Sequence, residues 1–145
     1  MRLNKKGFTL VELLAVIVIL GILLIVAIPA TTTIIDNSRK DSFVSSGKMY
    51  ISAMQNLVAA EMDTDVDYCA TVGHLAESGN TKNPWGSGNV EGIVVYSQST
   101  KKYTAYIKAG DKYADVNSDS TRSVVKDSSS NFAVDCSGKG TELAK

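Results

Sequence analysis

Hydrophobic residues are concentrated near the start of the chain. Across residues 8–30, Glu12 is the only formally charged side chain, whereas charged and small polar residues dominate after Asp36. As a helix, this apolar stretch would span about 34 Å, which matches the roughly 30 Å hydrocarbon core of a bilayer. The pattern therefore predicts one membrane-crossing helix over residues 8–30.

Beyond Ala30 the apolar positions continue at three- and four-residue spacing, which is typical of an amphipathic helix. They are Ile34, Ile35, Phe43, Val44, Tyr50, Ile51, Met54, Leu57 and Val58. After Pro29, no proline occurs before Pro84. The pattern predicts one helix of about 50 residues that ends near Glu61 and places its outer part in a domain spanning residues 31–145.

Short runs rich in β-branched and aromatic residues follow. They cover residues 92–96, 103–107 and 112–116, and a fourth lies near residues 131–134. Polar turns separate the first three, which predicts a β-meander and an α+β fold. Residues 62–91 carry no such run and are expected to form a long connection, in which a turn at Pro84 anchors Trp85 in the domain.

The charges orient the chain. Arg2, Lys5 and Lys6 precede the apolar stretch, so the positive-inside tendency places the N-terminus in the cytoplasm and the polar domain outside. The whole chain has 15 basic and 15 acidic residues, and without the first seven it has 12 and 15, a net charge of −3. This balance disfavours sequence-independent binding of nucleic acid.

Residues 6–14 (Lys-Gly-Phe-Thr-Leu-Val-Glu-Leu-Leu) resemble the prepilin motif of type IV pilins and type II secretion pseudopilins. The resemblance implies a leader of residues 1–7, cleavage between Gly7 and Phe8 by a prepilin peptidase, and N-methylation of Phe8. It also implies the pilin fold, in which a small antiparallel sheet packs on the outer half of the long helix.

Glu12 is expected to act in assembly. A charge inside an apolar helix costs about 2.5–3.5 kcal/mol at the bilayer centre, so it needs a partner. The new amine of Phe8 on a neighbouring subunit would supply one, and a carboxylate solvated by headgroups is the alternative. Gly21 and Pro29 are predicted weak points of the helix, where the resemblance implies partial unwinding in a filament and a simple kink is the alternative.

Cys69 and Cys136 both follow the apolar segment and would be exported with the domain. An even pair outside the cytoplasm favours a disulfide, and the alternative is that one or both are small buried residues. No cofactor is expected. Possible calcium ligands alternate at Asp63, Asp65 and Asp67 and again at Asp115, Asn117 and Asp119. Neither stretch completes an EF-hand loop, and calcium remains an alternative only at the second. His74 has no catalytic arrangement around it in the sequence, so no enzymatic activity is expected.

The function expected from these features is that of a structural subunit in a type IV pilus-like extracellular filament, acting in adhesion, motility or surface interaction. Expected partners are other pilins, the prepilin peptidase, an assembly platform and, before assembly, the cytoplasmic membrane. A pseudopilin of a secretion or DNA-uptake system is one alternative. Another is a single-pass anchored ectodomain that does not polymerise.

Overall fold

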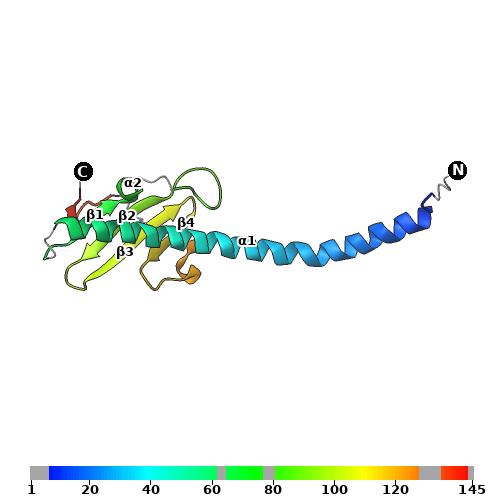
Figure 1. Ribbon diagram of the computed structural model, residues 1–145, viewed down its shortest axis with the longest axis horizontal. Helices are drawn as coiled ribbons and strands as arrows, with labels where there is room; N and C mark the ends of the chain where they lie inside the picture. The colour runs from blue at the N-terminus through cyan, green and yellow to red at the C-terminus, as the bar shows by residue number, and fades with distance from the viewer. Residues whose placement is uncertain (1–6, 62–64, 77–80, 128–134, 144–145) are drawn as a thin grey trace, which may run out of the picture. The chain divides into compact units, whose positions relative to one another are not determined.

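The computed structural model describes residues 7–61, 65–76, 81–127 and 135–143. Tertiary contacts divide the chain into two units, Met1–Asp36 and Asn37–Lys145, which are considered separately. The first unit contains the apolar part of the long helix. The second contains the rest of that helix and every strand of the sheet (Figure 1).

The long helix predicted from the sequence is confirmed. Helix α1 (Leu10–Glu61) has 52 residues and runs without interruption through Gly21 and Pro29. Its apolar part is dominated by Leu, Ile, Val and Ala, and the proline removes only one backbone hydrogen bond. The subunit therefore has no melted stretch at these two positions, and unwinding within a filament stays a prediction.

The sheet has six strands in the order β5-β4-β3-β2-β1-β6. The predicted meander is confirmed as the antiparallel strands β2 (Glu91–Ser97), β3 (Lys102–Ala109) and β4 (Lys112–Val116). Two-residue strands, β5 (Lys126–Asp127) and β6 (Thr141–Glu142), form the edges. Strand β6 pairs with β1 in parallel, so the sheet is mixed and not wholly antiparallel. No hairpin joins β6 to its neighbour, so nothing imposes the opposite direction.

The connection predicted over residues 62–91 is wrong in part. It contains strand β1 (Tyr68–Thr71) and the single-turn helix α2 (Val72–Leu75), and β1 pairs with β2 along its whole length. Four residues with two small members give too weak a β pattern to be recognised without the neighbouring strand. The strand predicted at residues 131–134 lies outside the described part of the chain.

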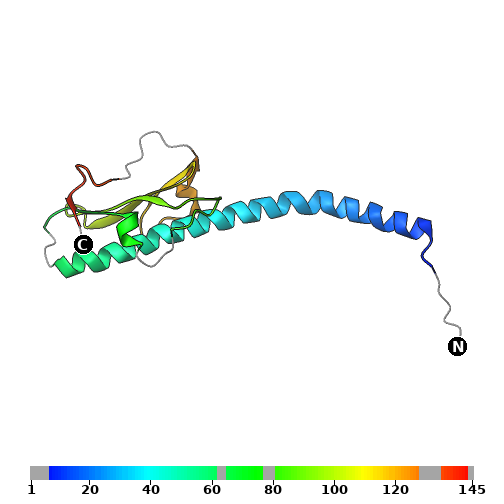
Figure 2. The ribbon, with the colours of Figure 1, turned by 90° about the horizontal axis from the view of Figure 1, so that it is seen from above.

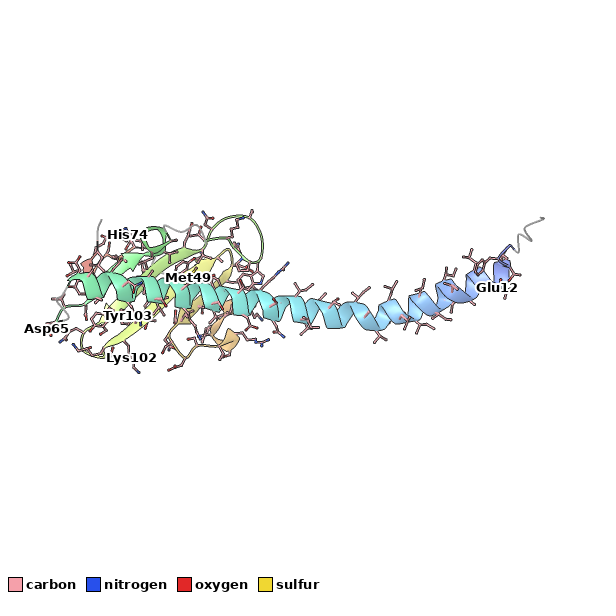
Figure 3. All side chains as sticks on the ribbon, in the orientation of Figure 1. Glu12, Met49, Asp65, His74, Lys102 and Tyr103 are labelled. Atoms are coloured by element: carbon pink, nitrogen blue, oxygen red, sulfur yellow. A yellow bond between two sulfur atoms is a disulfide. The ribbon has the colours of Figure 1, made fainter. Side chains whose placement is uncertain are left out.

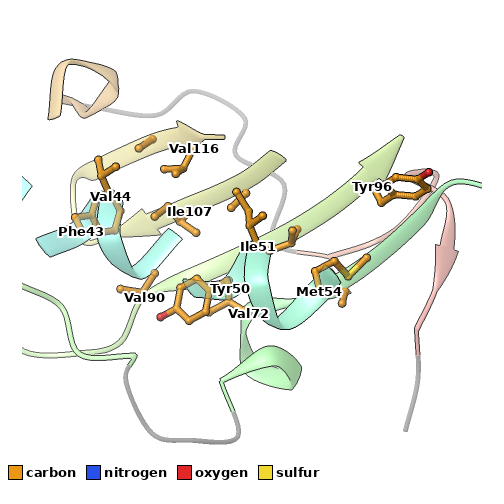
Figure 4. Close-up of a cluster of buried hydrophobic side chains, with 14 of the residues drawn as sticks. Phe43, Val44, Tyr50, Ile51, Met54, Val72, Val90, Tyr96, Ile107 and Val116 are labelled. Atoms are coloured by element: carbon orange, nitrogen blue, oxygen red, sulfur yellow. The ribbon is translucent and has the colours of Figure 1, made fainter. Parts of the chain in front are cut away.

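The core lies between the second half of α1 and one face of the sheet, which form two layers (Figure 2). Phe43, Tyr50 and Met54 on the helix are at most 1% exposed, and Ile107 and Val116 from the sheet are fully buried among them (Figure 4). Ile34 and Ile35 were expected in this stripe, but they are 66% and 50% exposed. They belong to the first unit, before the helix meets the sheet.

The opposite face of the sheet carries a smaller cluster. Cys69 of β1 forms a disulfide with Cys136, and both pack with Ile93 of β2. Since side chains alternate along a strand, Cys69 faces away from the helix while its neighbours Tyr68 and Ala70 face the main core. The disulfide thus attaches the C-terminal segment, which carries β6, to the outer face of the sheet.

Trp85 has the anchoring position expected for it. Its ring packs edge-on against Phe43, with 5.3 Å between the ring centroids. The Oδ1 atom of Asn83 accepts a hydrogen bond from the backbone N–H of Trp85 at 2.9 Å and fixes the turn around Pro84.

Candidate functional site at the start of the long helix

The peptide bond between Gly7 and Phe8 lies outside the helix. Residues 7–9 have no regular structure, and α1 begins at Leu10. Both Gly7 and Phe8 are exposed, Phe8 to 87%. A Cβ atom placed on Gly7 would meet no other atom within 4 Å, so the packing of the subunit does not require a glycine there. Any requirement for the small residue has to come from another molecule.

Thr9 and Glu12 form a capping box at the first turn of α1. The backbone N–H and the hydroxyl of Thr9 both donate to Oε2 of Glu12, each at 2.8 Å. In return, the backbone N–H of Glu12 donates to Oγ1 of Thr9 at 3.3 Å. The first backbone hydrogen bond of the helix follows at once, from Leu13 N to the Thr9 carbonyl at 3.2 Å.

This box determines where the helix starts. Thr9 caps the helix, so Phe8 and the bond that precedes it remain outside the helix and exposed. Thr9 is the residue that the sequence analysis missed. Its spacing to Glu12, a threonine three residues before a glutamate and ahead of an apolar run, is a recognised capping signal and could have identified it.

The helix surface beyond this turn is apolar and uncovered. In the most apolar window of α1 no residue is buried, and this helix is long and apolar enough to cross a membrane. The large hydrophobic side chains from Leu10 to Ile28 are each 48–83% exposed. Monomeric soluble proteins rarely expose so large a contiguous apolar patch, and such a patch is typical of a surface that contacts lipid or other apolar helices.

Gly21 lies within this surface. No atom lies within 4 Å of a Cβ placed on it, so nothing in the described part of the subunit needs its missing side chain. Glycine costs about 1 kcal/mol in a helix relative to alanine. A small residue in an apolar helix also lets the backbone of another helix approach closely. Closer packing between helices would compensate for the lower helix propensity of Gly21.

The acidic stretch at residues 115–119 is folded by its own hydrogen bonds. Oδ1 of Asn117 accepts from the Asp119 backbone N–H and from the Ser120 hydroxyl, each at 3.0 Å. The described residues contain no cluster of three or more His, Cys, Asp or Glu side chains that could hold a metal ion. In the other stretch, Asp63 lies outside the described residues, and Oδ1 of Asp67 accepts from the Gln98 backbone N–H at 2.7 Å.

Comparison with known protein families assigns the N-terminal segment. Residues 2–28 match the model described as the prokaryotic N-terminal methylation motif, which is the prepilin-type signal of type IV pilins and pseudopilins. The match covers residues 2–7, the Gly7–Phe8 bond, the capping box and the apolar helix as far as Ile28. No solved structure was found to match the chain.

Proposed function

We propose that this chain is a structural subunit of a type IV pilus-like extracellular filament and not an enzyme. A prepilin peptidase cuts after Gly7 and methylates the amine of Phe8, and the subunit then assembles through the apolar part of α1. One observation carries the proposal: the residues that match the methylation motif include an apolar helix that the subunit itself leaves uncovered.

The site of cleavage explains how the subunit is stored. Cutting before the apolar helix, and not after it, keeps that helix on the mature protein. The subunit then remains in the cytoplasmic membrane as a single-pass protein, with its N-terminus on the cytoplasmic side and its sheet domain outside. An assembly platform moves it from the bilayer into a filament, where the same helix is covered by helices of other subunits.

Glu12 directs that transfer. Within the subunit, Thr9 occupies Oε2 of the carboxylate, which removes part of the cost of placing the charge near the edge of the bilayer. The second oxygen, Oε1, accepts the methylated ammonium of Phe8 on a neighbouring subunit. In the low dielectric between packed helices such a pair is strong, and breaking it leaves a buried charge, so it sets the register of each new subunit.

The exported unit provides the outer surface of the filament. It acts in adhesion, motility or surface interaction, and its partners within the filament are other copies or related pilins. Its disulfide and buried core keep this surface folded outside the cell, where oxidising conditions preserve the Cys69–Cys136 bond.

The test is the Glu12→Gln variant expressed in the native host. Glutamine keeps the length and most of the capping geometry but removes the charge, so processing after Gly7 should persist while filaments in the sheared surface fraction fall at least about tenfold. Glu91→Gln, at an exposed position of β2, is the matched control and should assemble normally. Filament yield equal to wild type in Glu12→Gln would contradict the assembly role of Glu12. Absence of the wild-type chain from the sheared filament fraction would contradict the filament proposal itself and favour an anchored ectodomain that does not polymerise.

A further inference from the structure

A hollow of about 240 Å³ lies in the exported unit, between the end of α1, the β2–β3 turn and the loop after β4. The residues that line it include Gln55, Lys101, Lys102, Tyr103, Asn117 and Asp119. Figure 3 labels Lys102 and Tyr103, which begin strand β3. The hollow is smaller than the roughly 300–1,000 Å³ of sites for drug-sized ligands, so it suits a single small ring or one unit of a polymer.

Lys101 has a backbone conformation that lysine disfavours. Its φ is +55°, and it is the one non-glycine residue in the described part of the chain with a positive φ. It ends the four-residue turn between Ser97 and Lys102, which pair across the hairpin. Glycine or asparagine would fit this turn position at lower cost. The turn therefore places the Lys101 side chain at the hollow at some cost in backbone energy.

Tyr103 provides an aromatic wall. It pairs across the sheet with Tyr96, which in turn pairs with Tyr68, and the three rings form a row with centroid separations of 4.8 and 6.4 Å. Tyr68 and Tyr96 are each 4% exposed, whereas Tyr103 is half-buried at the hollow. The buried rings hold Tyr103 in place while part of it stays accessible to a ligand.

The remaining lining is polar and held in place. The hydrogen bonds of Asn117 to Asp119 and Ser120 fold the loop before any ligand arrives. Gln55 and Asn117 have amides that donate and accept, and Asp119 accepts. Two lysines and one carboxylate line the hollow, on a mature chain whose net charge is −3. Within the described residues, no ion pair is formed by Lys102.

We propose that this hollow binds an acidic saccharide, with a sugar ring against Tyr103 and its carboxylate at Lys101 and Lys102. The amides and Asp119 hydrogen-bond the ring hydroxyls, a mixture of donors and acceptors that a bare phosphate would not use. The site would let the exported surface attach to carboxylated polysaccharide. It does not depend on filament assembly, because every lining residue comes from one subunit.

The test uses the mature full-length chain in detergent micelles, titrated with trigalacturonate and followed by NMR. Saturable shifts of the backbone amides of residues 101–103 and 117–119 are expected. Lys101→Gly and Lys101→Asn should weaken binding at least about tenfold, the loss of one charge-assisted hydrogen bond, while Tm stays the same or rises because both residues suit a positive φ. Lys139→Gln, near β6, is the control and should bind as wild type.

Three results would overturn the proposal. They are an absence of saturable shifts at these amides, unchanged affinity in both Lys101 variants, and equal or tighter binding of a thymidine oligonucleotide or of inorganic phosphate. Maltotriose, which lacks the carboxylates, should bind at least about tenfold more weakly than trigalacturonate. Since binding is measured on the unassembled subunit, its failure would leave the proposed filament function unaffected.

Discussion

Gly47 of α1 lies directly against Val116 of β4: a Cβ atom added to the glycine would come within 2.9 Å of Val116 Cγ2 and 3.1 Å of Ile107 Cδ1. At Gly47 the helix backbone and the sheet approach each other so closely that a side chain on the helix would clash. The glycine therefore sets the separation of the two layers, although it lowers the intrinsic stability of the helix by about 1 kcal/mol.

Gly47→Ala should destabilise the exported unit by about 1–2 kcal/mol, since the cost of overpacking exceeds the gain in helix propensity. Urea unfolding in a mild detergent, followed by the fluorescence of Trp85, measures the change. Gly73→Ala is the matched control, because a Cβ there would meet nothing within 4 Å. Equal loss in both variants would show that the close approach to Val116 is not the cause.

The disulfide closes a loop with a sequence separation of 67 between Cys69 and Cys136. A cross-link of this length is expected to stabilise a domain by about 4 kcal/mol through the entropy of the unfolded chain. Reduction should therefore lower the urea midpoint of the wild type markedly. In the Cys69→Ala/Cys136→Ala variant, the midpoint should already be low and should not respond to reductant. A wild-type midpoint that reductant leaves unchanged, with full reduction verified by thiol labelling, would contradict this account.

Burial raises the pKa of the Tyr50 phenol above its usual value of about 10. The folded state thus favours the neutral phenol, so its contribution to stability is complete below about pH 10 and is lost as the pH rises through the raised pKa. Tyr50→Phe cannot ionise at this position. Above about pH 10, the unfolding free energy of the wild type should therefore fall relative to that of Tyr50→Phe. A difference between the two proteins that does not change with pH would contradict the assignment.

The capping box makes a separate prediction about Thr9. Thr9→Ala removes the hydroxyl that donates to Glu12 Oε2 and accepts from Glu12 N–H, so the first turn should fray at a cost of about 1 kcal/mol. Fraying exposes the Glu12 charge within the bilayer and should reduce filament yield while leaving cleavage after Gly7 intact. Thr9→Ser keeps the hydroxyl and should restore the yield. Equal yields from Thr9→Ala and wild type would exclude a role for the box in assembly.

The parts of the fold that were predicted from sequence are those with a long or regular pattern. Helix α1 is visible because its apolar spacing continues over 52 residues, and the meander because three β-rich runs are separated by polar turns. Strand β1 was missed since it has four residues, and its identity as a strand depends on pairing with β2 and β6. The edge strands β5 and β6, with two residues each, have no local signal at all.

The site follows the same division. Gly7, Phe8 and Glu12 lie within six consecutive residues, so the motif is recognisable from the amino-acid sequence, and the spacing of Thr9 to Glu12 makes the capping box recognisable as well. The hollow could not be predicted, because Gln55, Lys101 and Asn117 come from three separate elements that meet only after the helix packs on the sheet. Likewise, the positive φ of Lys101 is a property of the folded hairpin.

The central claim is that the chain is cut after Gly7 and then built into a surface filament. Mass spectrometry of the sheared extracellular fraction tests it most directly, because one measurement reports both the location and the N-terminus of the protein. The account predicts that this fraction contains the chain beginning at N-methylated Phe8. A chain that begins at Met1 or at any other residue, or one that remains entirely in the membrane fraction, would contradict it.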